Sequence, residues 1–442
     1  MMSGKINNSW KNVKKKQKEK IFNYSEGYKN FLNNCKTVRE TISFIETKAK
    51  ESGYENIENK YNLKKGDKVF FKKNNESIFL AKIMKNDLNI IVSHVDSPRL
   101  DLKPKPLVEK GGLAFFKTHY YGGIKKYQWV NIPLELRGVV ITSKGKIRIR
   151  EEVDFTISDL LIHLSKKQLK KKAKEVIGGE NLNVILANMP NNDSMKENVL
   201  YHLNKKYGLV EEDLITSDLN FVPKFKPNDV GFDKSMIGGY GHDDRSCVYN
   251  SLKAFLDTNN SIRTNIAMFV DKEEVGSDGN SGAKSRQIEY FIELIKSKCN
   301  WKKSINELLL NTNAISADVT SAYDPFFSDS YDPSNSTYLG DGVAIKKYTG
   351  SRGKSRTNES NAEYFYRFRE LSKNEKINWQ TGEIGKIDLG GGGTVAKFLA
   401  KLGLDIVDVG IPVLGMHSPY EIISKLDLYE CYRLFNKFYE KF

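Results

Sequence analysis

Acidic and histidine side chains follow several apolar segments of this chain, at positions suited to binding metal ions. The positions are His94 and Asp96 after 88–93, Glu273 and Glu274 after 266–270, Asp318 after 314–317, and His417 after 405–412. The chain has only six histidines, and two of them stand at these positions. A catalytic zinc site needs a few histidine and carboxylate ligands and one open position. Two metal ions about 3.5–4 Å apart, joined by a carboxylate, can polarise a carbonyl and generate hydroxide. The pattern therefore suggests a metal site of this kind without deciding it.

The four apolar segments are predicted to be buried strands of one sheet. Near-continuous apolar runs are typical of strands that are covered on both faces. Segments 248–257 and 287–297 have helical patterns and lie between these strands in the chain. Strands that alternate with helices predict an α/β sheet with helices on both faces. In such an open sheet, ligands bind at the carboxyl ends of the strands, which is where the acidic and histidine side chains fall.

The middle of the chain has a different texture. After Pro98, prolines and glycines are spaced among short strand-like segments, and 138–150 is a hairpin candidate that turns at 143–145. The lysine-rich stretch 166–174 is predicted to be helical. The segment 349–360 is rich in Gly, Ser, Arg and Lys and is predicted to be a polar loop.

The length of 442 residues usually means two domains, or one large domain that carries an insertion. We interpret 97–235 as a second domain inserted between two halves, 1–96 and 236–442, of an α/β domain. With 39% apolar and 28% charged residues, 33 Gly and 11 Pro, the composition excludes collagen, coiled-coil and wholly disordered chains.

The charge balance does not by itself indicate a nucleic-acid partner. Lys and Arg exceed Asp and Glu by 70 − 55 = 15, but the lysines are scattered and no aromatic-interleaved basic motif accompanies them. No window approaches the ~20 apolar residues of a membrane span, and no apolar segment follows the basic N-terminus as in a secretory signal. Four widely spaced cysteines predict reduced, mostly buried thiols. We expect a cytoplasmic protein that binds neither membrane nor nucleic acid.

Each candidate residue also has a purely structural interpretation. A histidine after a strand is often satisfied within the core or at the surface, and an adjacent Glu pair is often a solvated charge run. An Asp at the end of a strand is often a helix N-cap, and 238–241 is compatible with a simple turn. The run 390–393 is four glycines, but no Gly-Lys-Ser/Thr follows it, so a nucleotide site is excluded.

The order of the motifs is far more specific than any one of them. The motifs are His94–Asp101 with Lys103-Pro104, Gly241–Arg245, Asp271–Ser277, Ser316–Asp318 and Met416–Ser418. Together they resemble the aspartyl aminopeptidase (aminopeptidase I) family of dizinc metallopeptidases. The resemblance extends from about residue 20 to the C-terminus.

The resemblance implies a ligand set for two zinc ions. Asp243 would bridge the two ions through its two carboxylate oxygens. His94 and Asp318 would complete one site, and Glu274 and His417 would complete the other. Mn²⁺ and Co²⁺ are alternatives to Zn²⁺ in such sites.

The resemblance also implies two further roles. Asp96 would hold the imidazole of His94 in the tautomer that binds metal. Glu273 would be the general base, which takes a proton from the metal-activated water and delivers it to the leaving amine. Adjacent Glu residues can serve as base and ligand if the backbone turns after the strand.

For the architecture, the family implies a three-layer α/β domain of the zinc-exopeptidase type with a central mixed sheet. An inserted, β-rich dimerisation domain would interrupt it. Dimers would assemble into a tetrahedral dodecamer that admits only short peptides. The run 155–164 matches one in which a histidine of the inserted domain reaches a neighbour's active site, here His163. The alternative is a helix-face histidine that is satisfied within its own chain.

The residue preference is the part that the motifs leave open. Relatives that prefer N-terminal Asp or Glu carry a Lys that matches Lys346, but their His and Tyr correspond here to Ser321 and Gly353. The loss of two polar partners from a carboxylate-binding site can cost several orders of magnitude in selectivity. Acidic and neutral N-terminal residues therefore both remain candidate substrates.

The sequence thus predicts a metal-dependent aminopeptidase that acts on short peptides. One alternative is a carboxypeptidase or deacylase on the same dizinc core, although such enzymes need an Arg or similar clamp for a terminal carboxylate. The other is a non-catalytic basic homologue, whose binding to DNA would depend steeply on salt.

Overall fold

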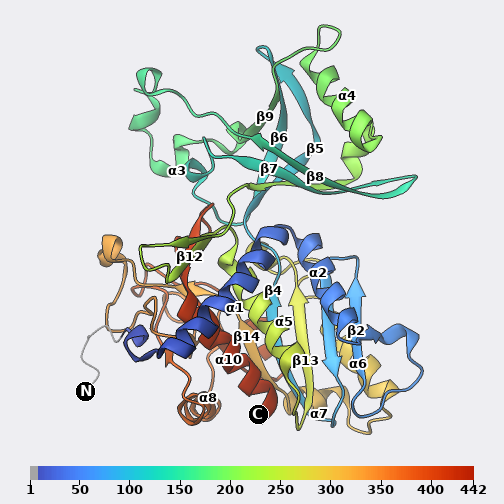
Figure 1. Cartoon of the computed structure of the whole chain (residues 1–442), viewed down its shortest axis with the longest axis vertical. Coiled ribbons are helices and arrows are strands. Elements are labelled where there is room, and N and C mark those ends of the chain that lie inside the picture. The colour runs from blue at the N-terminus through green and yellow to red at the C-terminus, as the bar shows by residue number, and fades with distance from the viewer. Residues whose placement is uncertain (1–7) are drawn as a thin grey trace. The chain divides into compact units, whose positions relative to one another are not determined.

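The computed structural model describes residues 8–442, which form two compact units (Figure 1). Unit 1 comprises the described residues up to Asp96 together with Pro227–Met416 and Glu421–Phe442. Unit 2 comprises Ser97–Lys226 and the short segment His417–Tyr420. The insertion predicted from the sequence spans 97–235. Residues 227–235, predicted to belong to the insertion, lie in unit 1 because β11 (Asn228–Val230) pairs with β12 (Met236–Gly239).

Unit 1 is built on a nine-stranded mixed sheet. In spatial order its strands are β1 (Glu55–Asn56), β2 (Lys68–Lys73), β3 (Ser77–Lys82), β13 (Thr264–Val270), β4 (Leu88–His94), β14 (Asn313–Ala317), β18 (Asp405–Gly410), β16 (Val343–Lys346) and β17 (Trp379–Gln380). The four predicted strands are its centre, and β13, β4, β14 and β18 pair in parallel. Their carboxyl ends therefore meet at one edge of the sheet.

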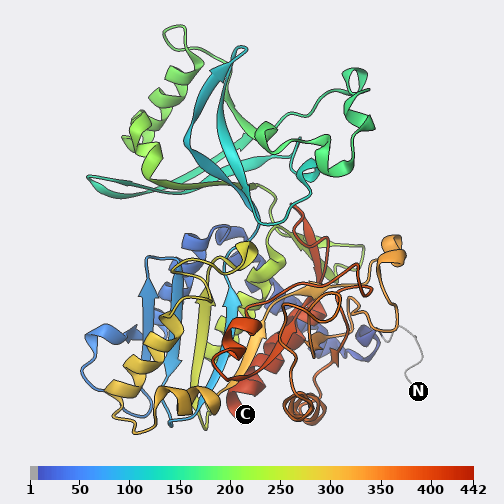
Figure 2. The same ribbon diagram turned by 180° about the vertical axis from the view of Figure 1, so that it is seen from behind.

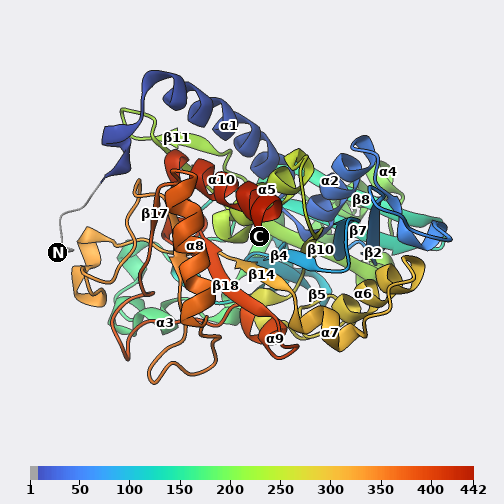
Figure 3. The same cartoon turned by 90° about the horizontal axis from the view of Figure 1, so that it is seen from below.

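Helices cover both faces of this sheet. One face packs on α1 (Lys15–Asn34), α2 (Val38–Glu51), α5 (His242–Asp257), α8 (Ala362–Asn374) and α10 (Lys425–Lys441). The other packs on α6 (Gln287–Lys298), α7 (Ile305–Leu310) and α9 (Ala396–Ala400). Figure 3 shows the two helical layers on either side of the strands, and Figure 2 shows α6 and α7 from behind. The result is the predicted three-layer α/β architecture.

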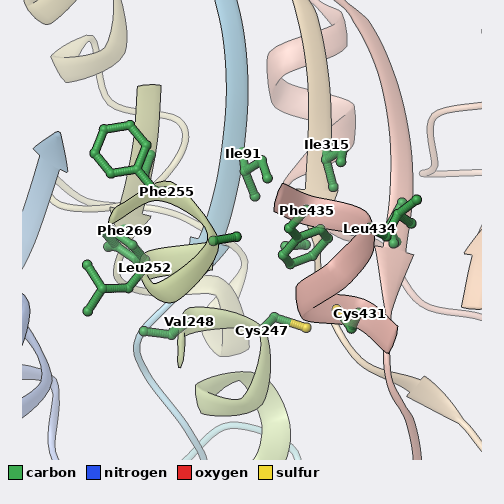
Figure 4. Close-up of a cluster of buried hydrophobic side chains, with 14 of the residues drawn as sticks. Ile91, Cys247, Val248, Leu252, Phe255, Phe269, Ile315, Cys431, Leu434 and Phe435 are labelled. Atoms are coloured by element: carbon green, nitrogen blue, oxygen red, sulfur yellow. The ribbon is translucent and has the colours of Figure 1, made fainter. Parts of the chain in front are cut away.

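Alternation along the strands explains the two cores. Ile91 of β4 faces the core that contains α5 and α10, whereas its neighbours Ile90 and Val92 face the core on the other side. Because successive side chains of a strand point to opposite faces, a strand must be apolar throughout to fill both cores. Figure 4 shows Ile91 and Ile315 beside the apolar side chains of α5 and α10.

A second, five-stranded sheet joins distant parts of unit 1. Its spatial order is β11, β12, β20 (Glu421–Ser424), β19 (Pro412–Leu414) and β15 (Thr320–Ser321). The antiparallel pairing of β12 with β20 sets Glu421 opposite Gly239. This register brings the strand after the last histidine motif beside the turn that precedes α5.

Unit 2 contains a six-stranded antiparallel sheet and one longer helix, α4 (Met195–Tyr207). In spatial order the strands are β8 (Gly145–Phe155), β7 (Leu134–Thr142), β10 (Ser217–Pro223), β5 (Arg99–Lys110), β6 (Leu113–Tyr121) and β9 (Asn183–Ala187). The pairing of β7 with β8 confirms the predicted hairpin.

The predicted helix over 166–174 is largely wrong. The structure has a single 3-10 turn at Gln168–Lys170 and a short helix, α3 (Ala173–Val176). This stretch has almost no apolar residues to form a buried face, and Leu169 is 64% exposed. Helices in proteins gain most of their stability from such a face, so lysines alone do not sustain one.

Two smaller predictions are confirmed, for the segment 349–360 and for the cysteines. The segment 349–360 contains turns and isolated bridges but no helix or strand of its own. All four cysteines are free, and three of them are buried. Among the described helices, none combines the length and apolar character needed to cross a membrane.

Candidate metal centre

Three buried side chains converge where strands β4 and β14 end. His94 is the last residue of β4, Asp318 follows β14, and Asp243 lies at the start of α5. The Nε2 atom of His94 is 3.2 Å from Oδ1 of Asp243 and 3.7 Å from Oδ1 of Asp318. With Asp244, these residues offer ligand atoms that all lie within 4.8 Å of one another. One imidazole nitrogen and several carboxylate oxygens are a donor set that suits zinc.

The local sequence explains why these side chains meet. The neighbouring strands β4 and β14 run parallel, so their last residues reach the same edge of the sheet. Gly241 precedes α5 with a φ of +80°, a left-handed conformation that glycine adopts at little cost. Asp243 and Asp244 depart from helical backbone angles before the regular helix begins. This turn lets both carboxylates lie at the sheet edge.

Asp96 connects the histidine with the Glu pair. Its Oδ1 is 3.2 Å from Nδ1 of His94, and its main-chain oxygen is 3.1 Å from the same nitrogen. The backbone N–H groups of Glu273 and Glu274 donate to the two carboxylate oxygens of Asp96, at 3.2 and 3.1 Å. An Nδ1–H that donates to Asp96 leaves the Nε2 lone pair of His94 directed at Asp243, as a metal ligand requires.

The acidic surroundings also raise the pKa of His94. Burial lowers its pKa, but hydrogen bonds to Asp243, Asp318 and Asp96 outweigh burial and raise the pKa well above its usual value. Such a concentration of buried carboxylates favours a positive charge at this position. A divalent cation would supply that charge.

The two glutamates that follow β13 lie on a tight turn. Lys272 has a φ of +69°, and Glu273–Val275 form a 3-10 turn. A carboxylate oxygen of Glu274 lies within 4.8 Å of one of Asp243. Burial raises the pKa of Glu273 to about 8; the charge of His94 opposes this shift, and the charges of Asp318, Asp96 and Asp243 add to it. The backbone thus turns directly after the strand, which is the condition under which adjacent glutamates can serve as base and ligand.

The remaining three predicted site residues, His417, His163 and Lys346, are described within their own units. His417 belongs to the segment grouped with unit 2, where its Nδ1 is 2.8 Å from the main-chain oxygen of Gly123. His163 lies on a 3-10 turn of unit 2, Ile162–Leu164, and is exposed. Lys346 ends β16 and is fully buried, with its Nζ 3.4 Å from the main-chain oxygen of Val319.

The pairing of β16 with β18 places the buried Lys346 opposite an acid. Lys346 of β16 is in register with Asp408 of β18, which is also buried. Burial raises the pKa of Asp408 to about 6, while the charge of Lys346 and a hydrogen bond from Thr394 oppose the shift. The positive charge of Lys346 is thus partly offset within the protein.

Two acids that the structure brings to this edge, Asp244 and Glu421, have no role predicted from the sequence. Asp244 is buried, and its Oδ2 accepts the backbone N–H of His94 at 3.3 Å. Its only signal in the sequence is its position beside Asp243. Glu421 accepts the backbone N–H of Asp243 at 3.1 Å. No sequence pattern predicts this contact, because it depends on the pairing of β12 with β20.

The fold and the donor set are those of a metal-dependent hydrolase. Residues 31–439 match the family model described as aminopeptidase I zinc metalloprotease (M18). A probable M18 family aminopeptidase 1 of Clostridium acetobutylicum is 43% identical over 444 residues, with 96% of each chain covered. The crystal structure of an M18 aminopeptidase from Thermotoga maritima has 42% identity, a TM-score of 0.95, and complete coverage of both chains.

This chain belongs to the aminopeptidase I zinc metalloprotease family. It is therefore an enzyme of the metallo-aminopeptidase class, a hydrolase that acts on peptides. The same fold occurs in the structure of an mApe1 dodecamer from S. cerevisiae, at 20% identity, a TM-score of 0.77, and coverage of 95% of this chain and 96% of that one.

Proposed function

We propose that this protein removes N-terminal residues from short peptides with two divalent metal ions, preferentially Zn²⁺. The observation that carries the proposal is the convergence of His94, Asp243 and Asp318, with Asp96 tying His94 to the Glu pair. Their nitrogen and carboxylate donors fit Zn²⁺, and Mn²⁺ or Co²⁺ as alternatives. When bound, such ions polarise the scissile carbonyl and lower the pKa of water.

The proposed ligands are divided between two metal positions. Asp243 would contribute one carboxylate oxygen to each. His94 and Asp318 would complete one position, and Glu274 and His417 would complete the other. Chain connectivity supports His417, because it directly follows Met416, a residue of the same unit as the carboxylates.

Glu273 is the proposed general base. A base must hold a proton only briefly, so its pKa should lie near the working pH. In the absence of bound metal, burial and neighbouring carboxylates raise the pKa of Glu273 to about 8, and bound cations would lower it from that value. The backbone hydrogen bond from Glu273 to Asp96 fixes this residue relative to His94. From that position Glu273 would take a proton from water and pass it to the leaving amine.

The proposal is tested by hydrolysis of a panel of chromogenic aminoacyl substrates. Metal-free enzyme receives zinc, manganese or cobalt, and release is measured for Asp, Glu, Leu, Met, Lys and Ala. We expect metal-dependent release from at least one of them, and enzyme without added metal is the control. If no substrate of the panel is hydrolysed with any of the metals, the aminopeptidase proposal is contradicted, and a deacylase or a non-catalytic role is favoured.

The same panel decides the residue preference. Release confined to Asp and Glu would show that Lys346 suffices for acidic side chains although Ser321 and Gly353 replace the His and Tyr of acid-specific relatives. Release of neutral residues would agree with the partial offset of the Lys346 charge by the buried Asp408 opposite it. The mechanism is the same in both cases.

We further propose that the chain assembles into a homo-oligomer through dimers, in the cytoplasm. A related fold is solved as a dodecamer. Unit 2 presents an apolar run around His163, in which Leu160, Leu161, Ile162 and Leu164 are 47–68% exposed. Exposed apolar patches of this kind mark interaction surfaces. A second copy of the chain would pack against this run, and His163 would then lie near the metal centre of that second copy.

Replacement of His163 by Ala tests that role. If His163 donates a hydrogen bond in a neighbouring site, His163→Ala should lower kcat by the ~10²–10³ typical of a lost transition-state donor. The zinc content should not change. His202→Ala, which removes another exposed histidine of unit 2, is the matched control. Wild-type kcat in the His163 variant would leave this residue without a catalytic role, and loss of zinc would make it a ligand.

A further inference from the structure

Glu421 is a buried acid beside the proposed bridging ligand, yet it belongs to neither metal position. It begins β20 and is only 1% exposed. Its Oε2 accepts the backbone N–H of Asp243 at 3.1 Å. The residues are 178 positions apart in the sequence, and the register of β12 with β20 brings them together by setting Gly239 opposite Glu421.

The backbone N–H of Asp243 needs an acceptor from outside its own helix. The first four N–H groups of a helix have no partner within it, and Asp243 is the second residue of α5. Its φ of −79° and ψ of 110° are not helical. The direction of the Asp243 carboxylate is therefore set by contacts with the rest of unit 1. Glu421 provides the contact at the backbone nitrogen of Asp243.

The surroundings of Glu421 include the buried phenol of Tyr28. Tyr28 of α1 donates to or accepts from Nδ1 of His242 at 2.7 Å, directly before Asp243. Burial raises the pKa of Tyr28 well above its usual value; the charge of Glu421 adds to this shift and the charge of Arg245 opposes it. Glu421 and Arg245 thus act with opposite sign on the same buried phenol.

We propose that Glu421 is a positioning residue for the metal centre, which holds the backbone of Asp243 so that its carboxylate can bridge two metal ions. A neutral acceptor would satisfy the N–H alone. A buried carboxylate makes the stronger, charge-assisted hydrogen bond and adds a negative charge behind a site that binds cations. Groups that orient metal ligands typically contribute 10- to 100-fold to metal affinity.

The test measures zinc affinity by competition with a chelator, in Glu421→Asp, Glu421→Ala and Glu421→Gln. Glu421→Asp shortens the side chain and draws the acceptor away from Asp243. We expect it and Glu421→Ala to lower zinc affinity 10- to 100-fold, and Glu421→Gln, which keeps an acceptor of the same length, to recover part of the loss. Zinc is the only probe, so the readout does not depend on peptide hydrolysis.

Glu430 supplies the matched control. It is a fully buried glutamate of α10 whose carboxylate accepts the backbone N–H of Asn378, a residue that is not a proposed ligand, at 3.2 Å. Glu430→Asp should lower the melting temperature without changing zinc affinity. If Glu421→Ala fails to fold, Glu421→Asp decides alone. Wild-type zinc affinity in Glu421→Asp, or an equal loss in Glu430→Asp, would overturn the proposal.

This inference rests on the proposed role of Asp243 as a metal ligand, and the experiment separates the two. A wild-type chain that binds no zinc would contradict the metal site itself. A wild-type chain that binds zinc tightly, together with an unaffected Glu421→Asp variant, would contradict only the role of Glu421.

Discussion

Glu273→Gln is expected to retain its zinc and lose nearly all hydrolysis. The amide cannot accept the proton of the attacking water, whereas the proposed ligands are untouched. General bases contribute about 10²–10⁴ to the rate, so kcat should fall by a factor in that range. The measurement is kcat on the best substrate of the panel, together with the zinc content of the same preparation.

The neighbouring glutamate provides the control for this substitution. Glu274→Gln makes the same chemical change one residue later, on the same turn. Because Glu274 is a proposed ligand, its variant should lose zinc as well as activity. A Glu273→Gln variant that keeps more than about a tenth of the wild-type kcat would refute the assignment of the base. Zinc loss in both variants would mean that both glutamates are ligands.

Asp243→Asn is expected to disrupt both metal positions at once. The substitution removes one negative charge and replaces one carboxylate oxygen by an NH₂ group, which has no lone pair to offer a metal. Every other proposed ligand serves a single metal ion. Zinc content, measured after dialysis against a weak chelator, should therefore fall further than in any other single-ligand variant, and hydrolysis should fall with it.

A second aspartate of the same helix tests whether this effect is specific. Asp257 ends α5 and pairs with Lys253 at 2.8 Å. Asp257→Asn should leave zinc content and activity at the wild-type level. An Asp243→Asn variant with full zinc content would contradict the bridging role, and His94→Ala would then show whether the cluster binds metal at all.

Much of the α/β unit could be predicted from the sequence, because the information is local. A strand such as β4 must fill two cores at once, so its residues are apolar throughout, and the run 88–93 shows this directly. The turn that carries Glu273 and Glu274 is also local, since it follows β13 at once. The prediction failed for the lysine-rich stretch 166–174, which has almost no apolar residues to form the buried face of a helix.

The sequence by itself determined which side chains could bind metal and that strands would present them at one edge. Only the tertiary structure decided what holds those side chains in place. Asp96 accepts hydrogen bonds from the backbone N–H groups of two residues that lie 177 and 178 positions away. Glu421 accepts one from the backbone N–H of Asp243, which the pairing of β12 with β20 brings close. The physical reason is that the backbone N–H group is the same in every residue except proline, so the sequence does not mark which N–H will bind which acceptor. Its acceptor is chosen by strand register and helix placement, which no motif records.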